Sequence, residues 1–244
     1  MSRRQPRIGI LGAMPEEVAS LVAELKNVQI TSEGRRKYHA GQLWGTDVVV
    51  AFSGWGKVSA ATTATQMIAS HQVGAIVFTG VAGALAPGLP VGEVVVGQRL
   101  LQHDLDARPL FKQYEVPGLG IAELPTDPDL TGELVEAAER YLGHTPRVGE
   151  ILSGDQFIAS REKVAELRQR RPEALCVEME GAAVAQVCLE YSISFGILRT
   201  ISDAADEHAH LDFPKFLREV ACRHSHGILQ EWLSPASTAP RGTP

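Results

Sequence analysis

The order of apolar and polar positions predicts strands and helices that alternate from residue 7 to about residue 233. Helical spacing and small-residue runs predict helices at 15–26, 56–70, 127–142, 161–171, 180–190 and 212–233, the last with Asp212 as its N-cap. Short apolar runs predict strands at 7–12, 37–43, 47–52, 74–79, 93–96, 147–152, 174–177 and 195–201. Because no linker or repeat interrupts this alternation, we expect one three-layer α/β domain over residues 7–233.

Three segments depart from the alternating pattern. Residues 102–124 have no clean period, are rich in turn residues and are long for a connection, which favours a functional loop. Four apolar side chains in this loop, Leu110, Phe111, Val116 and Leu119, indicate an interface between subunits, and a homodimer is the commonest closed assembly. Residues 1–6 and 234–244 are predicted to be flexible termini.

Composition narrows the functional class. The 244 residues include 44% hydrophobic and 21% charged side chains, as in an ordinary soluble globular protein. A net charge of −6 without a basic run disfavours nucleic acid or an anionic membrane as partner, and no apolar stretch approaches the ~20 residues of a membrane span. The three cysteines lie in apolar contexts and predict reduced thiols in a cytoplasmic protein, although their number alone leaves a catalytic cysteine open.

Acidic side chains follow two successive predicted strands. Glu178 and Glu180 end one strand, and Arg199, Ser202 and Asp203 end the next. In open α/β sheets ligands bind beyond the carboxyl ends of strands, and two carboxylates in different environments suit acid-assisted bond cleavage. A lone acid at such a place is more often a helix cap or a first-turn charge. That alternative explains neither the methionine between two glutamates nor the Arg-x-x-Ser-Asp pattern, so we predict a functional site.

Five motifs carry a resemblance to a known family. They are residues 9–18 (GILGAMPEEV), 79–84 (TGVAGA), 153–158 (SGDQFI), 177–180 (VEME) and 199–203 (RTISD). In this order they resemble the nucleoside phosphorylase superfamily, and most closely its 5′-methylthioadenosine/S-adenosylhomocysteine nucleosidases. The resemblance implies a central mixed, twisted sheet between two helical layers. It also implies hydrolysis of the bond between adenine and a 5′-thio-substituted ribose, with 5′-deoxyadenosine as a further candidate substrate and without a cofactor.

The resemblance implies two catalytic residues. Asp203 would protonate N7 of the purine, which makes adenine a better leaving group, and Glu17 would orient and deprotonate the attacking water. Carboxylates near the ribose suit this reaction, because the ribosyl group becomes cationic as its bond to nitrogen lengthens. The alternative for Glu17, and the better interpretation for Glu16, is a charge in the first turn of a helix.

The resemblance also implies a set of binding residues. Phe157 would stack on adenine, unless it is a plain core residue, and the Ile158 backbone would contact the base edge. Met179 and an ionised Glu180 would line the ribose diol. Arg199 is predicted to be the structural partner of an acid such as Glu180. The predicted substrate-binding residues are therefore Val81, Phe157, Ile158, Glu178, Met179, Glu180 and Ser202.

Two further segments raise the question of a metal. The sequence 206–210 (DEHAH) has an H-x-H spacing, and 103–106 (HDLD) is acidic. Neither has a further histidine or cysteine in register, so we expect no metal. Residues 103–106 look more like the loop that, in the resembling family, helps to form the 5′-substituent pocket across a dimer interface.

The chain also departs from the family it resembles. Val81 stands where these nucleosidases often carry serine, and the segment 107–111 (ARPLF) is expected to reshape the 5′ pocket. Three alternative functions remain: a purine nucleoside phosphorylase, a nucleosidase for a nucleoside such as futalosine, and a nucleoside-binding protein without activity. A phosphorylase needs cations for phosphate, whereas the turn after the first strand presents Glu16 and Glu17, so hydrolysis is favoured.

Overall fold

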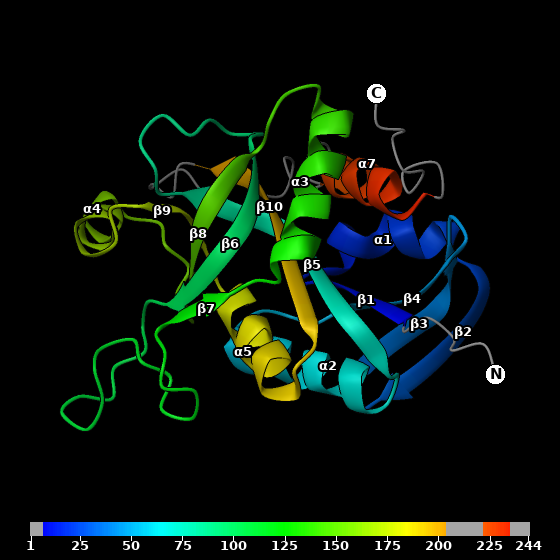
Figure 1. The fold of residues 1–244 in the computed structure, drawn as a ribbon, viewed down its shortest axis with the longest axis horizontal. Coiled ribbons are helices and arrows are strands. Elements are labelled where there is room, and N and C mark those ends of the chain that lie inside the picture. The colour runs from blue at the N-terminus through cyan, green and yellow to red at the C-terminus, as the bar shows by residue number, and fades with distance from the viewer. Residues whose placement is uncertain (1–6, 204–221, 235–244) are drawn as a thin grey trace, which may run out of the picture.

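A computed structural model describes residues 7–203 and 222–234. In these ranges the alternation of strands and helices is confirmed (Figure 1). The helices are α1 (Pro15–Glu24), α2 (Lys57–Ala69), α3 (Pro128–Leu142), α4 (Arg161–Arg170), α5 (Gly181–Tyr191) and α7 (Cys222–Leu233). The strands are β1 (Arg7–Gly12), β2 (Lys26–Glu33), β3 (Arg36–Leu43), β4 (Thr46–Phe52), β5 (Val73–Ala84), β6 (Val94–Gln102), β7 (Glu123–Pro125), β8 (Arg147–Ser153), β9 (Ala174–Glu178) and β10 (Ser194–Asp203).

The strands form one mixed sheet, as expected. Its order is β10-β6-β8-β9-β5-β1-β4-β3-β2, with β7 paired to β6. Strand β1 runs parallel to β4 and β5, whereas β2, β3 and β4 are antiparallel neighbours. Strand β5 pairs in parallel with β10 and, at its end, antiparallel with β9. The strands β5, β10, β6, β8 and β9 therefore close into a ring, which the sequence pattern did not predict.

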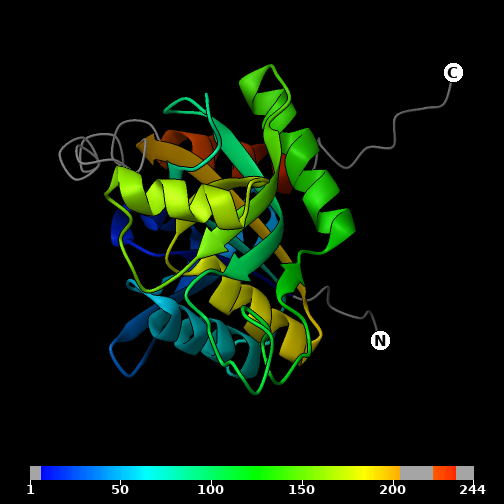
Figure 2. The same ribbon diagram turned by 90° about the vertical axis from the view of Figure 1, so that its left-hand side faces the viewer.

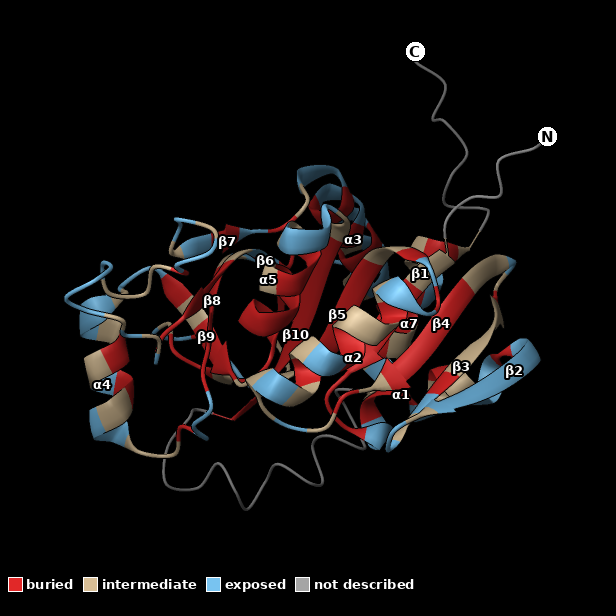
Figure 3. Cartoon of the chain, turned by 90° about the horizontal axis from the view of Figure 1, so that it is seen from below, coloured by how far each residue is buried: buried red, intermediate tan, exposed pale blue. Residues whose placement is uncertain are grey.

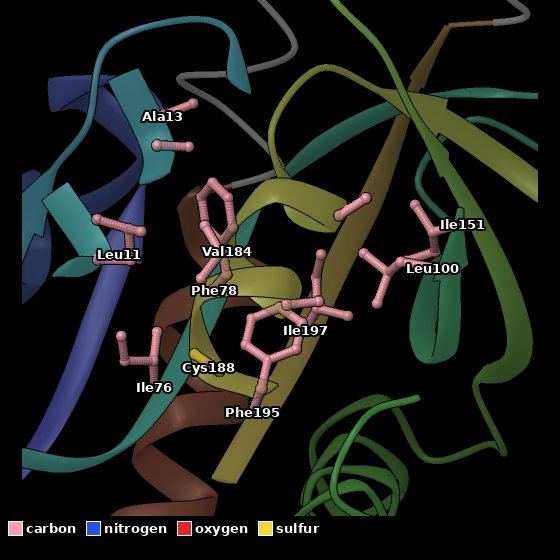
Figure 4. Close-up of a cluster of buried hydrophobic side chains, with 14 of the residues drawn as sticks. Leu11, Ala13, Ile76, Phe78, Leu100, Ile151, Val184, Cys188, Phe195 and Ile197 are labelled. Carbon is pink, nitrogen blue, oxygen red and sulfur yellow. The ribbon is translucent and has the colours of Figure 1, made fainter. Parts of the chain in front are cut away.

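Helices cover both faces of the sheet, which confirms the three-layer architecture. Helices α1, α3 and α7 pack on one face, and α2 and α5 pack on the other (Figure 1). The larger buried cluster joins Leu11, Ile76, Phe78 and Ile197 of the strands to Val184 and Cys188 of α5 (Figure 4). Helix α4 stands at one end of the molecule (Figure 1), the end that faces the viewer in Figure 2, and is anchored by a third, smaller cluster.

Helix α3 illustrates how local sequence sets an element. Asp127 precedes the helix and its Oδ1 accepts a hydrogen bond of 2.9 Å from the backbone N–H of Leu130. Pro128 occupies the first turn, and Gly143 ends the helix with a left-handed φ of 76°. Leu130, Leu134, Ala137 and Ala138 are buried, so the apolar stripe that predicted the helix faces the sheet.

Strand β2 was not predicted, and the first predicted helix ended too late. The helix ends at Glu24, and Lys26 begins a strand whose side chains are exposed except for the half-buried Glu33 (Figure 3). An edge strand with two solvated faces shows no apolar alternation. Its pairing with β3, rather than its own pattern, explains why it forms.

Other boundaries differ in length. Strands β5 and β6 extend beyond the predicted runs, and β5 includes the 79–84 motif that was expected to lie in a connection. Between β6 and β7 the chain is irregular, as predicted, with one isolated bridge between Val116 and Ile121. The expected flexible segments 1–6 and 234–244, apart from Ser234, and the expected N-cap Asp212 lie outside the described residues. No helix in the described ranges is long and apolar enough to cross a membrane.

Candidate active site

One pocket opens where β1, β5, β9 and β10 end. It collects most of the residues that the sequence placed in a site, although they lie in five separate motifs. The predicted residues that line it are Glu17, Val81, Phe157, Glu178, Met179, Glu180, Arg199, Ser202 and Asp203. Other lining residues are Ala13, Met14, Trp55, Thr79, Gly80, Ala82, Gly83 and Val177.

Glu17 is buried against the end of β5 rather than solvated in the first turn of α1. Its Oε2 accepts hydrogen bonds from the backbone N–H groups of Ala13 (2.6 Å) and Met14 (2.9 Å). Its Oε1 accepts one of 3.3 Å from Val81. Burial raises the pKa of Glu17 to about 6, although the charge of Arg199 and these backbone donors oppose the shift. A carboxyl with this pKa is ionised but still basic near neutral pH.

Two glycines make room for this carboxylate. A Cβ at position 80 would lie 2.7 Å from Glu17 Oε1, and a Cβ at position 12 would lie 3.2 Å from Oε2. The neighbouring Glu16, by contrast, is exposed, as expected of a first-turn charge. The fold thus separates two adjacent glutamates into a solvated one and one that faces the pocket.

Arg199 is the structural partner of an acid, as predicted, but that acid is Glu178 rather than Glu180, which was the example given. Arg199 Nη2 lies 2.7 Å from Glu178 Oε2, and both side chains are buried. Glu178 also accepts hydrogen bonds from Ser153 Oγ and from the backbone N–H groups of Glu180 and Gly181. These donors engage both of its oxygens. Glu178 therefore supports the start of α5, and its predicted contact with substrate stays a prediction.

Glu180 precedes the first residue of α5, and its Oε1 accepts a hydrogen bond of 2.7 Å from the backbone N–H of Gly56. Burial, together with the charge of Glu178, raises the pKa of Glu180 to about 8. Both causes act against the ionised form that the sequence analysis expected, and the protonation state in which Glu180 binds the ribose stays a prediction. A neutral carboxyl both donates and accepts hydrogen bonds, which also suits a ribose diol.

Asp203 and Ser202 end β10 on the opposite side of β5 from β1. Both are buried, and Ser202 Oγ donates a hydrogen bond of 2.6 Å to Asp203 Oδ2. Ser202 Oγ also lies 3.4 Å from the carbonyl oxygen of Ala82. The hydroxyl thus orients the carboxyl of Asp203 at the pocket wall.

Aromatic side chains provide apolar faces. Phe157 lines the pocket and is 48% exposed, so the alternative that it is a plain core residue is wrong. The Ile158 side chain is buried in the third cluster, and the role expected for its backbone stays a prediction. Trp55, 58% exposed in the pocket wall, was missed. A large aromatic between Gly54 and Gly56, both with positive φ, was the signal that could have revealed it.

Two segments raised the question of a metal, and the structure describes one of them, residues 103–106. Within the described ranges, no group of three or more His, Cys, Asp or Glu side chains is arranged to hold a metal ion. The buried ring of His103 packs against Gly154, while Asp104 pairs with Lys57. The His208 and His210 pair lies outside the described residues.

Comparisons with known proteins show the family of this chain. The model of the phosphorylase superfamily matches residues 7–234. A curated 5′-methylthioadenosine/S-adenosylhomocysteine nucleosidase from Chromohalobacter salexigens is 37% identical over 96% of this chain and 99% of its own.

Solved structures give the same result. A nucleosidase of that name from Neisseria meningitidis, in complex with methylthio-immucillin-A, matches with a TM-score of 0.89 and 36% identity, covering 96% of this chain and all of its own. A futalosine hydrolase of Helicobacter pylori matches with a TM-score of 0.85 and 32% identity, over 93% of this chain and 98% of its own. The chain therefore belongs to the phosphorylase superfamily and, within it, to the 5′-methylthioadenosine/S-adenosylhomocysteine nucleosidase family.

Proposed function

We propose that the protein hydrolyses the N-glycosidic bond of 5′-methylthioadenosine and S-adenosylhomocysteine, releasing adenine and the thio-ribose. The observation that carries this proposal is the convergence of Glu17, Glu180 and Asp203 on one pocket that also presents two aromatic side chains. The relatives that carry the nucleosidase name support the same substrates. A nucleoside-binding protein without activity would not need three acids in one pocket.

Proton transfer to the base comes first in the proposed mechanism. Asp203, oriented by Ser202, protonates or hydrogen-bonds N7 of adenine as the glycosidic bond lengthens. Positive charge then develops on the ribosyl group. Glu17 accepts the proton of the attacking water, a role that fits its raised pKa of about 6. The chemistry requires no cofactor.

Binding is divided between an apolar and a polar side of the pocket. Phe157 and Trp55 supply the aromatic faces, and base stacking on an aromatic side chain contributes about 0.5–1.5 kcal/mol beyond burial. Glu180 and Met179 bind the ribose, with the Glu180 carboxyl held in place by Gly56. Val81 occupies the wall beside Glu17 without a side-chain hydroxyl.

Charge favours water over phosphate as the nucleophile. Arg199 is the one cationic side chain among the described residues that line the pocket, and it is paired with Glu178. A phosphate dianion would have to approach Glu17 without an unpaired cation to hold it. This argument separates the proposed hydrolysis from phosphorolysis, although the superfamily takes its name from the latter.

The assay that tests the proposal measures adenine and sugar products from methylthioadenosine with and without phosphate. We expect adenine and the free thio-ribose at equal rates in both buffers. A ribose-1-phosphate product or a strict need for phosphate would identify a phosphorylase. Futalosine belongs in the same panel, because a futalosine hydrolase shares this fold. A strong preference for futalosine would replace the proposed substrate.

We also propose that the protein forms a homodimer, in which residues 102–124 of one subunit contribute to the active site of the other subunit. Leu110 is 84% exposed and Phe111 is partly exposed, which supports an apolar contact between subunits. Val116 is buried in the subunit core and Leu119 packs against it, so these two side chains are not available for the interface as expected.

Sedimentation of a Leu110→Asp variant tests this assembly. We expect a shift toward monomer, because a buried charge opposes subunit contact, and a loss of activity that higher protein concentration partly restores. Ile30→Asp, which changes an exposed apolar residue of β2, is the matched control and should sediment as wild type. A wild-type chain that is monomeric and fully active would contradict the dimer.

The same proposal extends to the environment of the protein. The catalytic unit spans residues 7–233, and its partner is a small nucleoside rather than nucleic acid or membrane. A cytoplasmic location is supported by the cysteines, because Cys176, Cys188 and Cys222 are all unpaired.

A further inference from the structure

Three segments at the rim of the pocket are joined through side chains. They are residues 53–57, from the end of β4 to the first residue of α2, residues 102–106, which begin at the last residue of β6, and residues 153–157, which begin at the last residue of β8. We call them the rim segments. They come from distant parts of the sequence, and each continues from a strand of the sheet.

Asp104 connects the other two rim segments. Its Oδ1 lies 2.7 Å from Lys57 Nζ, and its Oδ2 accepts a hydrogen bond of 2.8 Å from the backbone N–H of Asp155. Asp155 Oδ1 in turn accepts a hydrogen bond of 2.8 Å from the backbone N–H of Lys57. These three contacts close a triangle, in which each segment is bound to both others.

The triangle is tightly packed. Lys57 Nζ also donates to Gln102 Oε1 at 3.1 Å, and the Lys57 and Asp104 side chains are each about four-fifths buried. A Cβ at position 154 would lie 2.3 Å from His103 Nε2, and a Cβ at position 56 would lie 2.9 Å from Asp155 Oδ1. Glycine is therefore needed where the rim segments approach one another.

Lys57, Asp104 and Asp155 are not among the residues that line the pocket, but Trp55 and Phe157, each two positions from Lys57 or Asp155, are. Trp55 lies on the first rim segment and Phe157 on the third. Gly56, next to Lys57, donates its backbone N–H to Glu180. We infer that Lys57, Asp104 and Asp155 are positioning residues, which hold Trp55, Phe157 and the Gly56–Glu180 hydrogen bond in the arrangement that binds the nucleoside.

The physical basis is order rather than the strength of one ion pair. A partly exposed pair such as Lys57 and Asp104 contributes little free energy by itself. The two carboxylate oxygens of Asp104, however, bind two different rim segments, so this one side chain orders both segments before substrate arrives. Loops that are ordered in advance do not lose conformational entropy on binding, which increases affinity.

Hydrogen exchange of the whole protein tests the inference directly. In Asp104→Ala we expect faster exchange in peptides that cover 153–157 and also 53–57. The effect on 53–57 is diagnostic, because Asp104 binds the side-chain Nζ of Lys57 and no backbone N–H group of that segment. Faster exchange there must therefore be transmitted through the Lys57 side chain. Glu166→Gln, which removes partly exposed ion pairs with Lys163 and Arg170 on α4, is the control and should leave both peptides unchanged. Unchanged exchange at 53–57 in Asp104→Ala would overturn the inference.

Kinetics on methylthioadenosine supply the second readout, which rests on the proposed function. Stacking side chains bind ground state and transition state alike, so Asp104→Ala and Lys57→Met should raise KM about tenfold and change kcat much less. The double variant should lose little more than either single variant, because both break one triangle. Wild-type kinetics in both single variants, or additive losses, would overturn the inference. A wild-type protein without nucleosidase activity would instead refute the proposed function, and hydrogen exchange would still decide the triangle.

Discussion

Four carboxyl groups line one pocket, and each of them has different neighbours. Glu178 pairs with Arg199 and accepts hydrogen bonds from three further donor groups, so it serves as a structural residue. Burial and the charge of Glu178 raise the pKa of Glu180 to about 8, whereas backbone donors limit the pKa of Glu17 to about 6. Separation of pKa values within one site is what allows acid and base roles to coexist.

Asp203→Asn tests the acid role, since it keeps the size of the side chain but removes the transferable proton. We expect turnover of methylthioadenosine to fall by a factor of ~10²–10⁴, with a much smaller change in affinity. A nitrophenyl riboside, whose leaving group needs no protonation, should be spared. Assays of both substrates with wild type and variant decide the point, and equal losses on both would leave Asp203 with a structural role only.

At the scale of elements, β5 shows how a strand becomes part of a site. Its end pairs with β10 on one side and with Cys176 and Val177 of β9 on the other. Within this stretch Gly80 faces Glu17, and Val81 donates its backbone N–H to the same carboxylate. The small residues of the 79–84 motif thus serve close packing around a buried acid rather than a turn.

Gly80→Ala tests this packing. The added methyl would meet Glu17 Oε1 at 2.7 Å, so the carboxylate must move, and we expect activity to fall at least about tenfold. Gly132→Ala in α3 is the matched control, because a Cβ there meets nothing within 4 Å. That variant should keep full activity and gain up to about 1 kcal/mol of stability from helix propensity. Kinetic assays and thermal unfolding of both variants measure the contrast. Full activity in Gly80→Ala would show that Glu17 tolerates displacement.

The ends of helices and strands were predicted well where caps and apolar periodicity in the local sequence were strong. Helix α3 carries a cap, a proline, an apolar stripe and a terminal glycine, and it was predicted within one residue. Strand β2 carries no apolar alternation and was missed, because pairing with β3 determines it. The extension of β5 was missed for a similar reason, since glycines and alanines in a sequence indicate a turn as readily as a crowded strand.

At the scale of the whole molecule, the buried acids affect stability as well as chemistry. The pKa of Glu180 is about 8 in the folded protein, above its ordinary value of 4.5. Between these values the folded protein keeps a proton that the unfolded chain has released. The stability contributed by this group is therefore complete below about pH 4.5 and is lost as pH rises through 8.

Glu180→Gln should remove the loss of folding stability that Glu180 causes as pH rises, because glutamine does not ionise. We expect the variant to show a smaller fall in Tm from pH 5 to pH 8 than wild type, where each kcal/mol corresponds to about 2–4 °C for a chain of this size. Glu123→Gln is a control of opposite sign, because a hydrogen bond from Arg171 lowers the pKa of Glu123, so its stabilisation is lost at acid pH instead. Parallel slopes for wild type and Glu180→Gln would show that Glu180 is ionised in the folded protein.

The sequence by itself determined the three-layer class, the order of most elements and the identity of the acids. These properties depend on periodicity, caps and local motifs, which are readable within a few turns of chain. The resemblance of five motifs then predicted Glu17, Glu180 and Asp203 as members of one site, and the structure places all three at one pocket.

Only the tertiary structure decided how these residues relate to one another. Strand β5 pairs with both β9 and β10, which closes the ring of strands and brings their ends together. Burial then shifts the pKa values of the acids at these strand ends to different extents. Three properties depend on neighbours that are distant in the chain: the partner of Arg199, the raised pKa of Glu180 and the contribution of Trp55 to the pocket. Desolvation and through-space charge are properties of the folded arrangement, and no local pattern encodes them.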